Sequence, residues 1–414
     1  MKSKILITSF TLLFLHNITI IYSQTFTNYT TADGLVDNSV NCVDVDANDN
    51  IWFGTQNGIS KFDGTSWETH TISTDSGIIH NTIAAICVMN NGDVWVGTDY
   101  GASKFDGTQW TAYTEADGLG DNRINHIDQG PDGKIWFGDY DGVTVYDGAS
   151  WSSYNMSDGL PFGGIYYTSF DSNGDSWLAS DLGGLIKFDG TSFTIYDESD
   201  GLINDGVRAI AIDDQDNKWT GTADGISVFN NANIWTENHT MMLLLPPPDT
   251  LNPIEDVKIN SIGHIWVGIY VDYLVTEGGV AMYNGNTWTD YDVSDGLIGP
   301  VVRGLAIDSQ DFVWVATSTG VSKISNIPGN VNVLEKNSYN VYPNPTSGEL
   351  TLDLDNTFDN ITINIRTVTG KLVSTKEYTY TSKIYFEINE PPGIYIVEVT
   401  HQKGISARLR VVKQ

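Results

Sequence analysis

The chain has 414 residues with 52 acidic and 21 basic side chains, a formal net charge of −31, and only two cysteines. Nucleic acid is an unsuitable partner because phosphate recognition needs lysine and arginine, and two cysteines exclude a disulfide framework as the source of stability. Residues 24–336 hold 44 acids and 11 bases, whereas residues 337–414 hold eight of each, and we interpret the acidity as a source of solubility.

Residues 1–23 predict a secretory signal peptide. Lys2 and Lys4 precede a mostly apolar stretch, and Ser23 is a small residue suited to cleavage before Gln24. A transmembrane anchor is the weaker interpretation, because His16 and Asn17 interrupt the apolar run. We therefore expect export through the periplasm, a mature chain without a transmembrane segment, and a location outside the cell or on its outer surface.

Residues 24–326 contain a repeat of about 42 residues. All 12 tryptophans fall into two series. The first series is Trp52, Trp95, Trp136, Trp177, Trp219, Trp266 and Trp314. The second is Phe26, Trp67, Trp110, Trp151, Phe193, Trp235 and Trp288. A fixed period with aromatic landmarks is typical of repeat architectures, and we expect the first series to anchor the core between repeats.

Each repeat predicts four short strands. In the first repeat they are the apolar run 40–45, "IWFGT" at 51–55, "GISKFD" at 58–63, and an aromatic-led strand after the Asp-Gly pair at 63–64. Helical periodicity is absent. The seventh repeat lacks its fourth strand, and "TFTNYT" at 25–30 is a spare one. The sequence therefore predicts an all-β fold, a seven-bladed β-propeller closed by its N-terminal strand.

These units resemble the two-component regulator propeller repeats through their "DGL…N" and "D..G..W.GT..G" pattern. The resemblance implies an extracellular or periplasmic sensor-type propeller, for which glycans are frequent ligands. This chain departs from the sensors in having no transmembrane helix and no kinase, so a direct signalling role does not follow.

The C-terminal residues predict a second domain. After a polar linker at 327–338, short alternating strands within 339–414 indicate a small Ig-like β-sandwich. This segment resembles the C-terminal sorting domain of the type IX secretion system of Bacteroidetes-like bacteria, with matching residues Tyr342, Pro343, Asn344, Pro345 and Gly348. The resemblance implies recognition by that secretion machinery, followed by release or surface attachment. An ordinary Ig-like module is the alternative.

Two insertions predict the functional face. Nineteen residues separate Trp235 from Ile254, where most repeats have 14, and 22 separate Trp266 from Trp288, where most have 15 or 16. Both insertions, "MMLLLPPPDTLNPIED" and "YVDYLVTEGG", fall on the same face of the sixth repeat, and lengthened loops often carry function. Whether the first is a lid over the second or an arm for a partner stays open.

Polar residues on that face are candidates for ligand binding. They are Asn38, Asn81, Asn122, Tyr100, Tyr140, Tyr166, Arg208, Tyr270, Tyr273 and Arg303. Amides, guanidinium groups and tyrosine rings around a concave mouth suit a sugar, but the asparagines also suit Asx-type turns, and the channel charges could pair with one another.

Signals for metal and catalysis are weaker. "DSNGDSW" at 171–177 has carboxylates at calcium-like spacing, but too few oxygen ligands for a calcium loop, so we expect a turn there and no cofactor. Cys42 and Cys87 are expected to pack as small apolar residues. If the chain is an enzyme, Glu255, His126 and Tyr166 are the plausible catalytic set, and a polysaccharide or antibiotic lyase is the reaction class.

The leading hypothesis is a binding protein that captures a glycan or a surface protein on the face with the insertions. The alternatives are the lyase and a structural or adhesion component of the cell surface.

Overall fold

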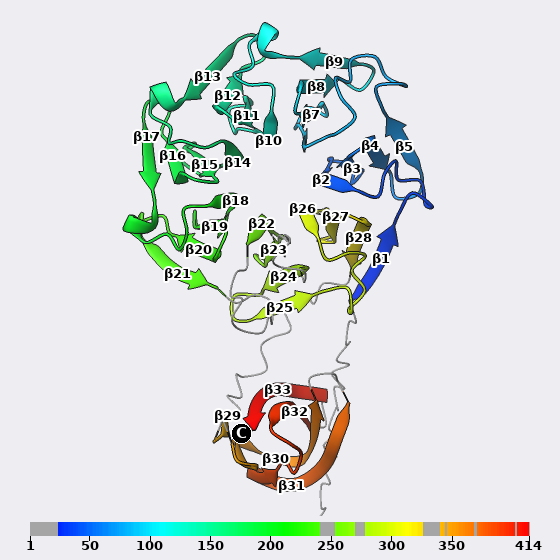
Figure 1. The fold of residues 1–414 in the computed structure, drawn as a ribbon, viewed down its shortest axis with the longest axis vertical. Coiled ribbons are helices and arrows are strands. Elements are labelled where there is room, and N and C mark those ends of the chain that lie inside the picture. The colour runs from blue at the N-terminus through cyan, green and yellow to red at the C-terminus, as the bar shows by residue number, and fades with distance from the viewer. Residues whose placement is uncertain are drawn as a thin grey trace, which may run out of the picture. The chain divides into compact units, whose positions relative to one another are not determined.

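The computed structural model describes residues 24–240, 253–269, 278–325, 340–343, 346–367, 371–401 and 404–413. The chain divides into two compact units, residues 1–329 and 330–414. The first unit contains seven four-stranded antiparallel sheets arranged in a ring (Figure 1). The predicted seven-bladed propeller is therefore confirmed. The predicted signal peptide and linker lie outside the described residues.

Each blade runs from an inner strand beside the central channel to an outer strand at the rim (Figure 1). The inner strands are β2 (Val40–Val45), β6 (Ala85–Val88), β10 (Ile124–Gln129), β14 (Ile165–Phe170), β18 (Val207–Ile212), β22 (Ile254–Ile259) and β26 (Val302–Ile307). The second strands are β3 (Ile51–Thr55), β7 (Val94–Thr98), β11 (Ile135–Asp139), β15 (Ser176–Ser180), β19 (Lys218–Thr222), β23 (Ile265–Ile269) and β27 (Val313–Thr317).

The third strands are β4 (Gly58–Phe62), β8 (Gly101–Phe105), β12 (Gly142–Tyr146), β16 (Gly184–Phe188), β20 (Gly225–Phe229), β24 (Val280–Tyr283) and β28 (Gly320–Ser325). The outer strands are β5 (Trp67–His70), β9 (Trp110–Tyr113), β13 (Trp151–Asn155), β17 (Phe193–Tyr196), β21 (Trp235–His239), β25 (Trp288–Tyr291) and, in the seventh blade, β1 (Thr25–Tyr29). Three single-turn 3₁₀ helices lie between outer and inner strands, η1 (Glu115–Asp117), η2 (Met156–Asp158) and η3 (Glu198–Asp200).

The second-strand tryptophans form the core between blades, as predicted. Trp95, Trp177 and Trp266 are fully buried. Trp52 of the first blade shares an apolar cluster with Ile83 and other residues of the second. Because each tryptophan packs against the next blade, every blade buries an apolar face that it could not bury alone.

A glycine two residues after the tryptophan lets neighbouring blades approach closely. A Cβ atom at Gly97 would lie 2.5 Å from the side chain of Ile124, which begins the next inner strand. Alanine replaces glycine in the fourth and seventh blades, at Ala179 and Ala316. The repeat therefore keeps this position small because the adjacent inner strand occupies the space.

The N-terminal strand closes the ring. Strand β1 pairs antiparallel with β28 over five residues, from Thr25 opposite Ser325 to Tyr29 opposite Val321. Tyr29 stacks on Trp314 of the seventh blade with 5.8 Å between ring centroids, and it packs against Trp67 of the first. The predicted closure is confirmed, and it removes two sheet edges.

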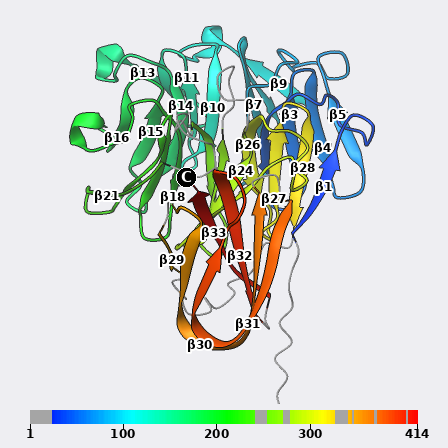
Figure 2. The same cartoon turned by 60° about the horizontal axis from the view of Figure 1, so that its bottom comes forward.

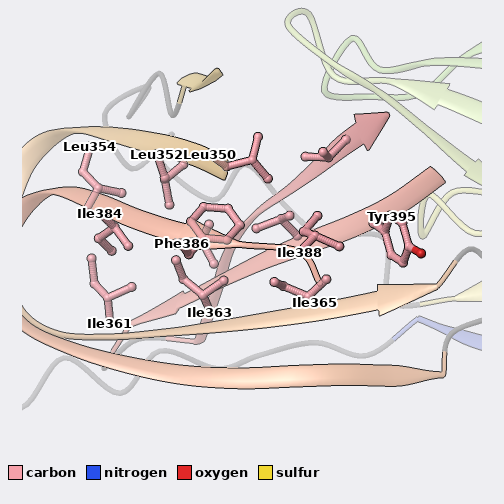
Figure 3. Close-up of a cluster of buried hydrophobic side chains, with 13 residues drawn as sticks. Leu350, Leu352, Leu354, Ile361, Ile363, Ile365, Ile384, Phe386, Ile388 and Tyr395 are labelled. Carbon is pink, nitrogen blue, oxygen red and sulfur yellow. The ribbon is translucent and has the colours of Figure 1, made fainter. Parts of the chain in front are cut away.

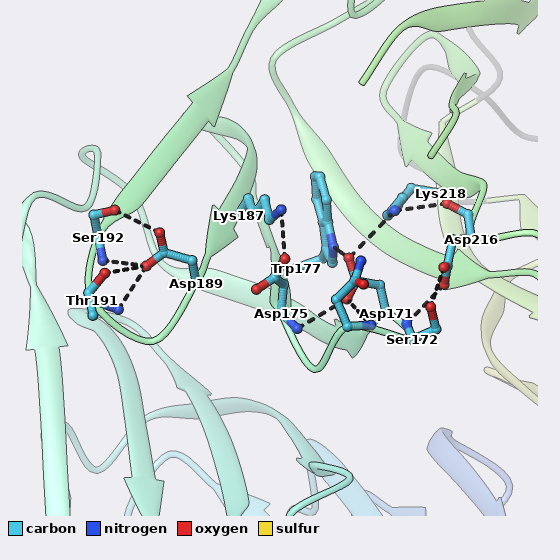
Figure 4. A network of polar contacts seen from close by, with 11 residues as sticks. Asp171, Ser172, Asp175, Trp177, Lys187, Asp189, Thr191, Ser192, Asp216 and Lys218 are labelled. Atoms are coloured by element: carbon cyan, nitrogen blue, oxygen red, sulfur yellow. Dashed lines mark hydrogen bonds and ion pairs between the residues drawn. The ribbon is translucent and has the colours of Figure 1, made fainter. Parts of the chain in front are cut away.

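The turns between inner and second strands join neighbouring blades on the face opposite the insertions. The backbone N–H of Ser172 donates to Asp216 of the next blade at 2.9 Å, and its hydroxyl donates to the same carboxylate (Figure 4). Ser309 contacts Asp49 in the same way, across the junction between the last and first blades. These serine–aspartate contacts supplement the strand pairing that closes the ring.

The second unit is a two-layer sandwich made by one bent antiparallel sheet. Its strands are β29 (Asn340–Tyr342), β30 (Glu349–Thr367), β31 (Leu372–Glu387), β32 (Gly393–His401) and β33 (Gly404–Lys413). Strands β30 and β31 curve strongly along their length (Figure 2), and their pairing register shifts between Asp353 and Phe358.

The shift separates β30 into two halves that face each other across the core. Leu350, Leu352 and Leu354 from the first half pack with Ile361, Ile363 and Ile365 from the second (Figure 3). Phe386 lies among them, and all of these side chains are buried. The alternation of apolar and polar residues along a long strand thus builds both layers, and the predicted small β-sandwich is confirmed.

The residues predicted to mark the sorting domain stand at the entry to this sandwich. Tyr342 ends β29, and Gly348 immediately precedes β30. Asn344 and Pro345 lie outside the described residues.

Candidate functional site

Two kinds of loop meet on the face where the insertions occur, which we call the entry face. The loop entering each inner strand lies against the loop between the second and third strands. His80 and Tyr100 come from these two loops and their rings lie 4.6 Å apart. The guanidinium group of Arg123 lies 3.5 Å from the ring centre of Tyr140. The predicted convergence of the two loop types is therefore present in the second and third blades.

The entry-face asparagines hold their own loops together. The side-chain oxygen of Asn38 accepts a hydrogen bond from the N–H of Thr31 at 2.8 Å. Asn81 accepts from Ile72, and Asn122 accepts from Glu115, each at 2.9 Å. Each of these side chains thus has a structural role as an Asx-type acceptor. Tyr100 and Tyr140 are more than half exposed and remain available to a ligand.

A cavity of about 290 Å³ opens in the propeller channel. Its wall includes one residue from the start of every blade, a set that we call the upper ring. The upper ring consists of Asn41, Ala84, Asn125, Tyr166, Arg208, Glu255 and Arg303. Three predicted ligand-binding residues, Tyr166, Arg208 and Arg303, are therefore brought together in one cavity.

The two arginines of the upper ring have different partners. Arg208 Nε donates to Asp181 Oδ1 at 3.0 Å, and its Nη1 lies 3.4 Å from Glu255 Oε2. Arg303 Nη1 donates to Ser39 Oγ at 2.9 Å and to Asn41 Oδ1 at 2.7 Å. Arg208 is thus neutralised by carboxylates, whereas Arg303 binds neutral oxygens.

Burial raises the pKa of Glu255 to about 7, although the positive charges of Arg208 and Arg303 act in the opposite direction. The carboxyl group is therefore close to half protonated at neutral pH, so it can either donate or accept a proton from a ligand in the cavity.

Below the upper ring lies a second set of polar groups, the deep cluster, which consists of Asp44, His126, Asp128, Tyr167, Asp256 and Lys258. Lys258 donates to the hydroxyl of Tyr167 and lies 3.7 Å from Asp256 Oδ1. Burial raises the pKa of Asp128 to about 7. Asp44 and Asp256 also accept backbone hydrogen bonds from the following blade, from Val88 and Leu305 respectively.

Most of the deep cluster was not foreseen from the sequence. A signal existed, since the fifth position of the inner strand is Asp44 in the first blade, Asp128 in the third and Lys258 in the sixth. Ionisable residues at a position that points into a propeller channel are costly to bury unless they are paired. Their pairing becomes visible only when the ring is closed.

His126 lies in the cavity with Glu255 and Tyr166. Its ring stacks on Tyr167 with centroids 3.9 Å apart, and its Nε2 has no hydrogen-bond partner among the described residues. Burial lowers the pKa of His126 to about 3, so the imidazole is neutral at physiological pH. The three residues suggested for an enzyme therefore share one cavity.

Several predicted positions have other outcomes. Tyr270, Tyr273 and most of both insertions lie outside the described residues, so their contribution to the site stays a prediction.

At 171–177, one oxygen of Asp171 accepts two turn N–H groups and the other accepts the indole N–H of Trp177 at 3.0 Å (Figure 4). This geometry fits the expected turn. Neither cysteine forms a disulfide in the described structure, and Cys87 is buried.

Family models match two parts of the chain. A two component regulator propeller model matches residues 34–57, within the first repeat. A secretion system C-terminal sorting domain model matches residues 340–414. No curated protein matches the chain. No helix within the described ranges has the length and apolar character that crossing a membrane requires.

Solved structures share the fold at low sequence identity. One is the extracellular domain of BT3049 from B. thetaiotaomicron, described as a hybrid two component system, with 19% identity, a TM-score of 0.62 and coverage of 94% of this chain and 55% of that one. Another is PorZ, a surface component of the type-IX secretion system of Porphyromonas gingivalis, with 18% identity and a TM-score of 0.57. The alignment covers 92% of this chain and 60% of PorZ. The present chain thus spans less than two thirds of either protein.

A third similar structure is virginiamycin B lyase from Staphylococcus aureus, as a catalytically inactive variant with quinupristin. It has 13% identity and a TM-score of 0.59, and the alignment covers 74% of this chain and all of that one. Together, the fold and the two family matches show that the chain is a propeller with a two component regulator propeller repeat, followed by a secretion system C-terminal sorting domain that directs it to the cell surface or out of the cell.

Proposed function

We propose that this surface or secreted propeller is a binding protein that captures a glycan or a protein partner at the channel mouth on the entry face. The observation that carries the proposal is the cavity of about 290 Å³ whose wall contains amide, phenol, guanidinium and carboxyl groups. Its volume is near the lower end of the range for small-molecule sites. The cavity thus suits the terminal unit of a larger ligand better than a long segment.

The chemistry of the upper ring favours a sugar. Sugar hydroxyl groups need directional hydrogen-bond partners, which Asn125, Arg208 and Glu255 can provide, and the half-buried Tyr166 offers an aromatic surface. Tyr100 and Tyr140 extend the aromatic surface outside the cavity. Two insertions of the sixth repeat on the same face support the choice of this end of the channel.

The test is binding to an array of bacterial surface polysaccharides and dietary glycans by the wild type, Tyr166→Ala and Arg208→Ala. We expect both variants to lose most of the binding, and a control on the opposite face, Lys134→Ala, to keep it. Binding that is absent, or equal in all four proteins, would reject this site. Capture of surface proteins without any sugar would instead favour the structural or adhesion role.

A lyase is the second candidate. It is supported by Glu255, His126 and Tyr166 lining one cavity, with a Glu255 carboxyl group whose pKa of about 7 suits proton transfer. In an elimination, a base removes a proton from one carbon, and the electrons of that C–H bond form a double bond to the next carbon. The C–O bond on that second carbon breaks, and its electron pair leaves on the oxygen, which takes up a proton. Glu255 is the group in this cavity suited to be that base.

The lyase is tested by incubating the protein with polysaccharides and with cyclic depsipeptide antibiotics. Formation of an unsaturated product, seen by ultraviolet absorbance and mass spectrometry, should be lost in Glu255→Gln and kept in Lys134→Ala. If no product forms with any substrate class, the binding function remains and the lyase is rejected.

A further inference from the structure

Arg303 differs from the other cations of the propeller. Eight of the ten described lysine and arginine side chains of residues 24–325 lie within 3.7 Å of a carboxylate oxygen. Lys61 lies over the ring of Trp52 at 4.9 Å instead. Among the described residues, no carboxylate lies within ion-pair distance of Arg303. In a chain with 52 acids, a cation in the channel without such a partner needs an explanation.

Arg303 is held in place by neutral groups that keep its charge available. Its Nη1 donates to Ser39 and Asn41, on the first blade, while Asn41 Oδ1 also accepts from Gln56 at 3.1 Å. These contacts with neutral oxygens position the guanidinium group at the cavity wall and do not neutralise its positive charge. A positioned guanidinium fork suits a planar carboxylate, which it can bind through two parallel hydrogen bonds.

The upper ring has one short side chain, two blades on from Arg303. The upper ring carries Ala84 in the second blade, next to Asn41, where other blades have longer side chains. Asn125, one blade further, donates its amide N–H to the carbonyl of Ile165 at 3.2 Å, and its amide oxygen, which has no donor among the described residues, can accept a hydrogen bond from a hydroxyl. Around the ring, Arg303 thus lies two positions before Ala84, with Asn41 between them, and Asn125 lies one position after it.

We propose that the ligand is an acidic saccharide whose terminal carboxylate binds Arg303. This rests on the proposed binding function and specifies its ligand class. The sugar carboxylate supplies the negative partner for the positive charge of Arg303. Asn125 accepts a hydrogen bond from a ring hydroxyl, and the sugar ring lies next to Ala84. A saccharide is favoured over an acidic peptide because the cavity takes only a compact terminal unit, and its polar wall offers little apolar surface to an extended chain.

Glu255 makes this binding dependent on pH. The groups that face its carboxyl group are Arg208 and Arg303 from the flanking blades, Tyr166, and Asp256 from its own strand. When Glu255 is ionised it competes for the charge of Arg303, and when it is protonated the competition ends. A sugar carboxylate stays ionised from about pH 6 to about pH 8, so its affinity should fall several-fold as the pH rises over that range.

The experiment uses a panel of uronic-acid trisaccharides, each paired with the same trisaccharide after reduction of its carboxyl groups to alcohols. Binding is measured by calorimetry with the full chain. We expect at least about tenfold tighter binding of one acidic form than of its reduced partner, the effect typical of a charge-assisted hydrogen-bond pair. Arg303→Gln should abolish this difference, and Glu255→Gln should remove its pH dependence.

Controls separate loss of binding from loss of folding. Arg303→Gln retains an amide donor for Ser39 and Asn41, and its melting temperature is compared with that of the wild type. Lys61→Gln removes the other described cation of residues 24–325 without a carboxylate partner, outside the cavity, and should change nothing.

The outcomes distinguish the two proposals. If neutral sugars bind as well as acidic ones and Arg303→Gln affects neither, the acidic-ligand proposal is overturned and the binding function stands. An acidic peptide is measured in the same way, and if it binds through Arg303 while no saccharide does, the saccharide class is wrong. If no acidic or reduced saccharide and no acidic peptide binds, the acidic-ligand proposal is overturned, and the glycan array and capture of surface proteins decide the binding function separately.

Discussion

At the residue scale, the channel shows how burial changes the chemistry of ordinary side chains. Asp128 and Glu255 each have a pKa raised to about 7 by burial, whereas the carboxyl group of Asp147 in an exposed turn has its pKa lowered by hydrogen bonds from Ser150 and Ala149. The fold thus contains carboxylates that favour protonation near neutral pH beside others that remain ionised. This difference comes from location, since the chemical group is the same.

Asp128→Asn tests the cost of burying that carboxyl group. The folded state binds the Asp128 proton more tightly than the unfolded chain, so between about pH 4 and pH 7 it holds more protons and its free energy of unfolding decreases as pH rises. We expect Asp128→Asn to weaken this decrease and to melt above the wild type at about pH 8, with little difference at about pH 4. The measurement is thermal unfolding across that range.

Asp147→Asn is the matched control, because the lowered pKa of Asp147 makes its contribution to the free energy of unfolding rise with pH, whereas that of Asp128 falls. Its ionised form supports the fold above about pH 4, so the substitution should give no gain at about pH 8. Equal melting curves for wild type and Asp128→Asn at both pH values would contradict the buried-carboxylate interpretation.

At the scale of single elements, the four-strand repeat explains most of the propeller. A tryptophan followed two positions later by a small residue recurs in each blade, an Asp-Gly turn recurs in several, and the strands form where the pattern predicts them. Strand β1 is the exception, because it completes a blade whose other strands come at the far end of the propeller sequence. Its role was nevertheless predictable from a missing strand at one end and a spare strand at the other.

Deletion of residues 24–30 tests the closure. The deletion exposes the edge of β28 and removes Tyr29 from its contacts with Trp314 and Trp67. We expect a lower and broader thermal transition, together with aggregation measured by light scattering. Loss of one large buried aromatic side chain typically lowers the free energy of unfolding by about 3–5 kcal/mol. Because Tyr29 is partly exposed, Tyr29→Ala should lower it by about 3 kcal/mol or less.

Thr27→Ala is the control, since Thr27 lies on the same strand and is exposed. It should melt like the wild type. A deletion variant with an unchanged, cooperative transition would show that β1 is dispensable for closure.

At the scale of the whole molecule, two compact units serve different purposes. The propeller contains the candidate site, and the C-terminal sandwich matches the sorting domain. Each unit has its own apolar core, with Trp95 and its neighbours in the propeller and Leu352 and its neighbours in the sandwich. Separate cores predict separate unfolding transitions.

Gly348→Val tests this separation. Gly348 has φ of 139°, which a β-branched residue rarely adopts, and its N–H donates to the hydroxyl of the buried Thr346. We expect calorimetry to show a destabilised sandwich with an unchanged propeller transition, and export in a host with type IX secretion to fall. Lys371→Ala, at an exposed position, should leave both unchanged, whereas loss of the propeller transition in Gly348→Val would contradict independent units.

The sequence by itself determined the number of blades, the strand order, the closure and the sandwich. These features follow from local patterns repeated along the chain, and each repeat carries the same tryptophan and small residue for the same packing reason. The sequence also placed Tyr166, Arg208, Glu255 and Arg303 at equivalent positions of neighbouring repeats, because the period alone assigns a residue to the channel.

Only the tertiary structure decided how those residues pair. Lys258 of the sixth blade contacts Tyr167 of the fourth, and Arg303 of the seventh contacts Asn41 of the first. These partners are 91 and 262 residues apart in the chain, and they meet because a closed ring brings all inner strands around one axis. The partners of each group depend on this closure, so no local pattern could have shown that, among the described residues, Arg208 has carboxylates within ion-pair distance whereas Arg303 has none.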